Sequence, residues 1–174
     1  MTGVANLIVR DLAERDFAAA HALNESVVPA VNSLSPGGLR RLASLSVAAL
    51  VAEYRGEVAG LALVMLEGLD YESDNYAWLS ARYNDFAYVD RIAVSETARG
   101  LGIGRTLYAE VFERLSGLRE TLLCEVNLAP ANPTSVAFHT AFGFRQIGER
   151  WTQDRSKGVV YMARPVHPPP SIRK

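Results

Sequence analysis

The glycine-rich segment from Arg99 to Arg105 has the composition of an anion-binding loop. It follows a run of strand-forming residues and leads into a segment with helical periodicity. A strand, a glycine turn and a helix in succession aim several backbone N–H groups and the positive end of the helix dipole at one point. Gly100, Gly102 and Gly104 allow close approach of the backbone to a ligand, and the two arginines add positive charge. The segment therefore predicts a phosphate or pyrophosphate site.

Two common phosphate-binding patterns do not fit this segment. G-x-G-x-x-G begun at Gly100 would need glycine in place of Arg105, and begun at Gly102 it would need glycine in place of Leu107. The pattern G-x-x-x-x-G-K-[ST] also fails, because Arg105 occupies its second glycine position and no lysine follows. The sequence thus disfavours a P-loop NTPase and a dinucleotide-binding fold.

Periodicity along the chain indicates the elements that would hold the loop. Segments with helical spacing of apolar residues, or with helix start and stop signals, are 14–28, 39–45, 102–115 and 133–142. Segments rich in strand-forming residues are 5–9, 47–54, 58–66, 86–94, 121–127, 144–151 and 159–163. Asn132 is the expected N-cap of the last helix and Gly143 its end. The polar and aromatic stretch 67–85 is expected to form a long functional loop.

The chain as a whole has the composition of a globular protein. It has 174 residues, of which 49% are hydrophobic and 21% charged, and its net charge is −1. This length suits a single domain, expected over residues 1–166 and followed by a Pro-rich tail at 167–174. The small net charge gives no reason to expect nucleic acid as a partner, and no apolar stretch reaches the ~20 residues that span a bilayer. With Cys124 as its single cysteine, the protein is expected to be cytoplasmic and to hold no metal.

The loop and its surroundings resemble the acetyl-CoA site of the GNAT acetyltransferase superfamily. The pattern of that site, R/Q-x-x-G-x-G/A, is met by Arg99, Gly102 and Gly104. The neighbouring matches, to the strand end before the loop and to a downstream N-x-x-x-x-x-L-Y-x-x-x-G-F signature, are Ile92-Ala93-Val94, Asn132 and Gly143-Phe144. The resemblance covers residues 88–144, and the hairpin upstream also follows the order of elements in the family.

This resemblance implies a fold, a cosubstrate and the residues that bind it. The implied fold class is α/β (α+β), with a mixed, mostly antiparallel central sheet of about six to seven strands flanked by about four helices. The implied cosubstrate is acetyl-CoA, with its pantetheine arm paired to the strand end and its pyrophosphate bound by the loop amides. The residues expected to bind it are Ile92, Ala93, Val94, Arg99, Gly100, Leu101, Gly102, Ile103, Gly104, Arg105 and Asn132.

The resemblance also implies acetyl transfer to a primary amine, on a small molecule or at a peptide or protein N-terminus. An α-amine has a pKa of about 7.7–8.0 and is largely protonated at neutral pH, so a general base is expected. Glu125 resembles the base of the ribosomal-protein N-terminal acetyltransferases, although a position on an edge strand or a salt bridge would also explain a charged residue there. Asp90 is the second candidate, and pairing with a nearby arginine is its structural alternative.

The departing thiolate needs a proton or a hydrogen bond, which the family usually supplies from a tyrosine. His139 stands at that position here. Histidine donates a proton near neutral pH, but a helical histidine beside Phe138 is equally compatible with a structural role. Strand alternation directs Cys124 away from Glu125, which favours direct transfer in a ternary complex over an acetyl-cysteine intermediate.

The acceptor site is expected near the stretch 67–85. Its candidate residues are Tyr88, Trp78, Tyr83 and Asn127. The sequence is similar to a group of predicted bacterial acetyltransferases with no assigned substrate, so the identity of the amine stays open, and the resemblance is compatible with a homodimer. Two other functions remain open: a non-catalytic acyl-CoA-binding or regulatory module, and a nucleotide-binding protein that uses the loop for ATP or NAD.

Overall fold

A computed structural model gives the fold of the protein and describes residues 6–167. Within this range the chain forms seven strands, five α-helices and two short 3-10 helices. In chain order they are β1 (Leu7–Asp11), η1 (Glu14–Asp16), α1 (Phe17–Ser26), α2 (Pro36–Leu45), β2 (Ala48–Tyr54), β3 (Glu57–Leu66), α3 (Asp74–Ser80), β4 (Ala87–Val94), η2 (Glu96–Ala98), α4 (Ile103–Leu115), β5 (Thr121–Ala129), α5 (Pro133–Ala141), β6 (Arg145–Trp151) and β7 (Gly158–Pro165). The sheet is mixed and mostly antiparallel, in the order β1-β2-β3-β4-β5-β7-β6, which confirms the expected fold class. Apart from residue 167, the predicted Pro-rich tail lies outside the described residues.

The chain divides into two compact units. Unit 1 comprises Met1–Met65 and Val89–Val111, and unit 2 comprises Leu66–Tyr88 and Phe112–Lys174. The division crosses β4 and α4, so each of these elements contributes residues to both units. The glycine loop belongs to unit 1, whereas the other two groups of interest, around Glu125 and His139, belong to unit 2.

Unit 1 is built on an antiparallel meander of β1, β2 and β3. In its register Val9 lies opposite Ala52, and Leu50 lies opposite Ala62. The β2–β3 connection turns through Arg55 and Gly56, whose φ angles are 54° and 84°. Two consecutive residues with positive φ form the tight type of hairpin turn that matches the twist of the strands. The two strands predicted on either side of this turn are confirmed.

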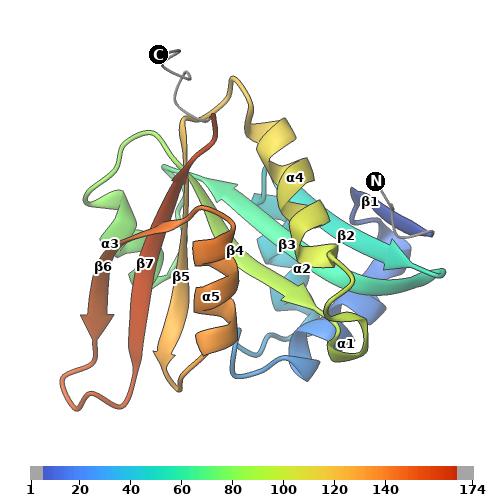
Figure 1. The fold of residues 1–174 in the computed structure, drawn as a ribbon, viewed down its shortest axis with the longest axis horizontal. Helices are drawn as coiled ribbons and strands as arrows, with labels where there is room; N and C mark the ends of the chain where they lie inside the picture. Colours follow the sequence, from blue (N-terminus) through green and yellow to red (C-terminus); the bar gives the residue numbers. More distant parts are fainter. Residues whose placement is uncertain (1–5, 168–174) are drawn as a thin grey trace. The chain divides into compact units, whose positions relative to one another are not determined.

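One face of this meander is covered by α4, and α1 and α2 lie on the opposite face (Figure 1). Gly60 on β3 lies directly beneath α4. A Cβ atom at this position would lie 2.8 Å from Ile103 Cγ2 and 3.0 Å from Leu107 Cδ1, closer than packed atoms approach. The absence of a side chain at Gly60 therefore lets the first turn of α4 pack on the sheet, and this contact fixes one end of the glycine loop.

Unit 2 contains the start of β4 followed by β5, β7 and β6. Tyr88 on β4 pairs in parallel with Leu123 on β5. The β5–β7 and β7–β6 pairings are antiparallel, and the β5–β7 register places Glu125 opposite Tyr161. Helix α5 packs on β5 (Figure 1). The predicted strands and the α5 helix of this unit are thus confirmed. Strand β7, which follows β6 in the chain, lies between β6 and β5 in the sheet.

The prediction of a single long loop over 67–85 is wrong, because this stretch contains helix α3. Ser73 is its N-cap, with the side-chain oxygen accepting a hydrogen bond from the Tyr76 backbone N–H at 3.3 Å. Tyr76 and Leu79, three residues apart, are both buried. The Tyr76 hydroxyl also donates to the carbonyl oxygen of Leu66 at 2.7 Å. A helix of seven residues with two buried positions has too short an apolar pattern to stand out among polar neighbours.

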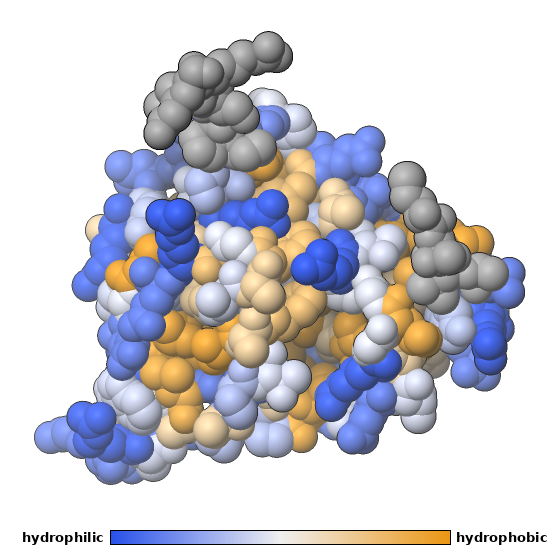
Figure 2. Space-filling view, in the orientation of Figure 1, coloured by the Kyte–Doolittle hydropathy of each residue, from blue (hydrophilic) through white to orange (hydrophobic). Residues whose placement is uncertain are grey.

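The end of the β6–β7 hairpin has a hydrophilic surface. Figure 2 shows strongly hydrophilic side chains at the end of the β6–β7 hairpin, where Asp154, Arg155 and Lys157 are exposed. Among residues 6–167, no helix is both long enough and apolar enough to cross a membrane.

Candidate functional site

The glycine loop of unit 1 is open to solvent on the side of its glycines. Gly100 and Gly102 both have a φ of 79°, a left-handed conformation that favours glycine. A Cβ atom at either position would have no heavy atom within 4 Å. Arg99 and Arg105 are exposed at the two ends of the loop, and Leu101 between them is half-buried. A ligand could therefore approach the loop backbone closely.

The first turn of α4 supplies backbone donors to the same place. Thr106 N donates to the Gly102 carbonyl oxygen at 3.0 Å and so makes the first bond of the helix. The N–H groups of Ile103, Gly104 and Arg105 precede it and have no acceptor within the helix. They point along the helix axis with the positive end of its dipole. Donors, charge and open space together fit a pyrophosphate.

The strand end before the loop is held in place by β3. Residues Ile92–Val94 on β4 are buried or half-buried. The backbone N–H of Ser95, the next residue, donates to the carbonyl oxygen of Ala59 at 2.8 Å. Helix η2 then leads into the loop. Both ends of the loop are therefore attached to the sheet of unit 1, one through this bond and the other through Gly60.

Glu125 lies on β5 in unit 2 and is held by donors from two other elements. The Tyr88 hydroxyl donates to Glu125 Oε1 at 2.9 Å, and Asn75 Nδ2 donates to the same oxygen at 3.1 Å. Tyr88 is 1% exposed, and Glu125 is half-buried. Both donors are neutral groups that come from other elements. Glu125 is thus a fixed carboxylate, as a general base requires.

Asn75, the second residue of α3, connects Glu125 to β6 and β7. Its Oδ1 accepts hydrogen bonds from the Tyr161 hydroxyl at 2.9 Å and from Arg150 Nη2 at 3.3 Å. Arg150 Nη1 also donates to Asp74 at 3.3 Å. Burial raises the pKa of Tyr161, and the charge of Arg150 partly offsets this shift. Tyr161 therefore keeps its proton at neutral pH and acts as a donor to Asn75.

Trp78, a predicted acceptor-site residue, stacks on the same tyrosine. Its ring centroid lies 4.0 Å from that of Tyr161, with 11° between the planes. The Arg82 guanidinium lies 3.7 Å from the Trp78 centroid. Two groups this close must occupy opposite faces of the ring. A Cβ at Gly148 would lie 2.7 Å from the indole, so glycine is needed there for the stack. Trp78 thus packs against Tyr161 and holds the tyrosine ring in place. The part of Trp78 in acceptor binding stays a prediction.

Asn127 and Asn132 lie on either side of the turn from β5 to α5. Asn132 N donates to the Asn127 carbonyl oxygen at 3.1 Å, which closes the turn. The Asn132 side chain accepts from Ser135 N at 3.2 Å and so acts as the N-cap of α5. Tyr83, which follows α3, is half-buried, and its N–H donates to the carbonyl oxygen of Leu79 at 3.0 Å. These contacts are structural, and the predicted binding roles of the three residues stay predictions.

Asp90, the second candidate base, lies in unit 1 and is paired with its neighbour. Arg91 Nε donates to Asp90 Oδ2 at 2.7 Å, and the two side chains are 4% and 3% exposed. Arg91 Nη1 also donates to Asn24 Oδ1 at 2.7 Å and to the carbonyl oxygen of Asn32 at 3.3 Å. The structural alternative considered for Asp90, pairing with an arginine, is therefore present. The contacts of Asp90 are therefore those of a residue in a buried ion pair.

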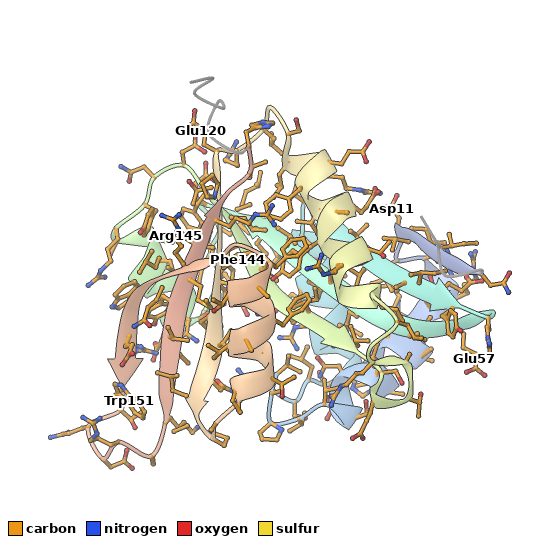
Figure 3. The ribbon with its side chains drawn as sticks, viewed as in Figure 1. Asp11, Glu57, Glu120, Phe144, Arg145 and Trp151 are labelled. Carbon is orange, nitrogen blue, oxygen red and sulfur yellow. The ribbon has the colours of Figure 1, made fainter. Side chains whose placement is uncertain are left out.

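His139, the candidate acid, is buried on α5 at 3% exposure. Its Nδ1 lies 2.7 Å from the carbonyl oxygen of Ser135, so Nδ1 carries the proton and donates it. The ring makes edge contacts with Phe138 and Phe144, at centroid distances of 5.3 and 5.2 Å. Figure 3 shows Phe144 beside the C-terminal end of α5. Burial lowers the pKa of His139, which favours a neutral imidazole, a weak proton donor.

Cys124 is 2% exposed in the core of unit 2. Burial raises the pKa of its thiol well above the ordinary value, and the nearby charge of Glu125 acts in the same direction. Since the thiolate is the nucleophilic form, these surroundings suit a core residue rather than an acetyl carrier.

Three residues of the Glu125 cluster were not predicted as site residues: Asn75, Arg150 and Tyr161. Asn75 lies in the stretch expected to be a loop, and nothing in its immediate sequence distinguishes it. Tyr161 could have been found from the antiparallel pairing of β5 with β7, because the register sets it opposite Glu125. The sequence does not reveal that register, because β5 and β7 are not consecutive strands and no hairpin turn joins them.

Comparison with known proteins gives one family match and several similar structures. Residues 12–144 match the acetyltransferase (GNAT) family. The ribosomal-protein-S18-alanine N-acetyltransferase of Escherichia coli is 18% identical, with a TM-score of 0.72 over 97% of this chain and 99% of that chain. Ard1 from Thermoplasma volcanium is 15% identical, with a TM-score of 0.76 over 94% and 100%. The Salmonella typhimurium yncA protein, solved with its cofactor acetyl-CoA, is 18% identical, with a TM-score of 0.69 over 97% and 100%. No curated protein matches the chain.

Proposed function

Because this chain belongs to the acetyltransferase (GNAT) family, whose members use acetyl-CoA, we propose that it transfers the acetyl group of acetyl-CoA directly to a primary amine. The observation that carries the proposal is the fixed carboxylate of Glu125, with the Tyr88 hydroxyl at 2.9 Å and Asn75 Nδ2 at 3.1 Å from one of its oxygens. A module that only binds acyl-CoA has no need of such a carboxylate, so this arrangement favours an enzyme.

The residues expected to hold acetyl-CoA fit its phosphates. The loop 99–105 offers three helix-start N–H groups and two exposed arginines, and its glycines leave the backbone open. Gly102 is the key position, because its φ of 79° disfavours any L side chain and it directly precedes these donors. The backbone of Ile92–Val94 would pair with the pantetheine arm, as the resemblance implies. When bound, acetyl-CoA supplies an acetyl group activated as a thioester, and CoA is the leaving group.

Glu125 is the proposed general base. The acceptor amine arrives largely protonated and must lose a proton before its nitrogen can form the new C–N bond. Glu125 accepts that proton, and the hydrogen bonds from Tyr88 and Asn75 keep the carboxylate in one orientation while it does so. Formation of the C–N bond breaks the C–S bond, and the second proton of the nitrogen is balanced by protonation of the departing thiolate, so that the products are the amide and the free thiol of CoA. Asp90 and His139 remain the alternative base and the candidate acid, and their buried partners make each the weaker assignment.

The acceptor is proposed to be a small-molecule amine or a peptide or protein N-terminus. Among the similar structures, the Escherichia coli enzyme acts on the alanine of ribosomal protein S18, which motivates including peptide N-termini. The structure carries acidic and aromatic residues on α3 of unit 2, and these are compatible with a cationic acceptor.

An acceptor screen tests the proposal. Purified protein and acetyl-CoA are incubated with primary amines, amino acids and short peptides, including one that begins with alanine, and products are identified by mass spectrometry. The same peptides with blocked N-termini are the controls. We expect a mass gain of one acetyl group on at least one free amine and none on its blocked form. Calorimetric binding of acetyl-CoA with no product across the screen would instead support a non-catalytic module. Tight ATP binding without acetyl-CoA binding would support a nucleotide-binding protein.

A further inference from the structure

We infer that Asn75 is a positioning residue, whose carboxamide holds Glu125 in the orientation and charge state in which Glu125 accepts a proton. The inference rests on the proposed function of Glu125 as the base. Asn75 and Glu125 are 50 residues apart in the chain, and their bond joins α3 to β5. The hydrogen bond alone leaves open what fixes the carboxamide itself, and the neighbours of Asn75 supply the answer.

The surroundings of Asn75 permit only one orientation of its carboxamide. Nδ2 donates to Glu125 Oε1 at 3.1 Å, while Oδ1 accepts from the Tyr161 hydroxyl at 2.9 Å and from Arg150 Nη2 at 3.3 Å. The reversed carboxamide would place its oxygen against the carboxylate and its NH2 group against the guanidinium. Both contacts lack a matching donor and acceptor. Arg150 and Tyr161 therefore determine that Asn75 offers a donor to Glu125.

Arg150 and Tyr161, which fix the Asn75 carboxamide, are themselves held against α3. Arg150 contacts Asp74 and Asn75, which are consecutive residues, with 3.3 Å to each. Ser73 caps the helix immediately before them. The Tyr161 ring is held by its stack on Trp78. A hydrogen-bonded chain thus runs from β6 through α3 to the carboxylate on β5, and the neutral Asn75 separates Arg150 from Glu125.

The charge state of Glu125 depends on groups from every element packed around it. These titratable and charged groups are Tyr88 on β4, Cys124 on β5 itself, Tyr161 on β7, Arg150 on β6, Asp74 on α3, and Arg82 following α3. In this set Asn75 is a neutral group in direct contact with the carboxylate. A negative charge in its place would face Glu125 at hydrogen-bond distance.

The test compares two variants of Asn75 in the intact protein. Asn75→Asp keeps the size of the side chain but replaces the donor with a carboxylate, and two carboxylates this close share a proton up to higher pH. We expect the acidic limb of the kcat/KM profile to move up by at least about one pH unit. Asn75→Leu removes the donor without adding charge. We expect it to lower kcat by about tenfold and to leave the KM for acetyl-CoA unchanged.

A matched control and a second readout make the result decisive. Asn84→Asp adds the same charge to an exposed position of unit 2 and should leave the profile unchanged. The titration of Glu125, followed by carbon NMR with labelled glutamate, should move upward in Asn75→Asp even when no acceptor is present. An unmoved titration overturns the inference, and so does an unmoved pH profile accompanied only by a lower melting temperature. If the wild-type protein acetylates no amine, the proposed function fails, whereas the NMR titration still decides the part played by Asn75.

Discussion

The glycine loop of unit 1 and the Glu125 cluster of unit 2 are built from different kinds of hydrogen-bond donor. In the loop the donors are backbone N–H groups of consecutive residues, and what matters is the absence of side chains at Gly100 and Gly102. In the cluster the donors are side chains, Tyr88 and Asn75, which come from different elements. The loop therefore depends on local backbone conformation. The cluster depends on the identity of each side chain and on the register of the strands.

This difference predicts that each region can be disabled without the other. The largest expected effect is that of Glu125→Gln, which keeps the shape but removes the proton acceptor. We expect kcat to fall by about 10²–10⁴-fold, the usual contribution of a general base. The Kd for acetyl-CoA, measured by calorimetry, should stay within a factor of about two.

Glu120→Gln is the matched control for this variant. Glu120 is exposed at the start of β5, as Figure 3 shows, and the same change there should leave kcat unaltered. Full activity of Glu125→Gln would contradict the base assignment and return Asp90 to consideration. A large loss of acetyl-CoA affinity would instead break the distinction between the two regions.

A smaller effect, on acetyl-CoA affinity rather than on kcat, is expected for Gly102→Ala. A left-handed φ costs an L-residue roughly 1–2 kcal/mol, so an alanine here favours a shift of the loop backbone that carries the donors. We expect the Kd for acetyl-CoA to rise about tenfold, equal to about 1.4 kcal/mol, with little change in kcat at saturating acetyl-CoA.

Gly117→Ala separates backbone strain from binding in this experiment. Gly117 has a φ of 74°, and a Cβ there would also meet nothing within 4 Å. Both variants should lose similar stability to thermal unfolding, but only Gly102→Ala should lose acetyl-CoA affinity. Equal affinities for the two variants would show that the loop glycine does not contribute to the acetyl-CoA site.

The smallest effect on activity is expected for His139→Gln. We expect kcat to change by less than about threefold, because a buried neutral imidazole is a weak acid. Stability should respond to pH. Burial lowers the pKa of folded His139 below the ordinary histidine value of about 6.5, so the unfolded chain takes up a proton first as the pH falls. Wild-type stability is therefore greatest above this value and is lost as the pH falls through it.

Denaturant unfolding at pH 8 and at pH 5.5 checks this prediction. The loss of stability between the two values should be smaller in His139→Gln than in the wild type. His167→Gln, at an exposed position, controls for the removal of a histidine. A kcat loss in His139→Gln as large as that of Glu125→Gln would restore His139 as the catalytic acid.

The comparison also explains which features the sequence could reveal. The strand and the helix on either side of the loop were predicted correctly because their signals lie within a few residues, and α4 begins at Ile103, one residue from the expected start. Glu125 could be named from its strand. Its partners could not, since Tyr88 and Asn75 are 37 and 50 residues away in the chain. Such contacts follow from tertiary packing and strand register, which local patterns do not encode.

Asp90 and His139 illustrate a second limit. Both residue types suited the predicted chemistry, and both positions lay in correctly predicted elements. Their partners, Arg91 and the Ser135 carbonyl oxygen, favour other roles. A titratable residue can be identified from sequence, but its proton affinity depends on burial and on neighbours that become visible only in the fold.

The stack of Trp78 on Tyr161 gives the molecule an optical reporter. Both tryptophans of the chain, Trp78 and Trp151, belong to unit 2. Tryptophan emission therefore comes only from this unit. With ring centroids 4.0 Å apart, Trp78 accepts excitation energy from Tyr161, whose hydroxyl is bonded to Asn75. Fluorescence can thus follow events beside Glu125 while acetyl-CoA and amines are added in turn.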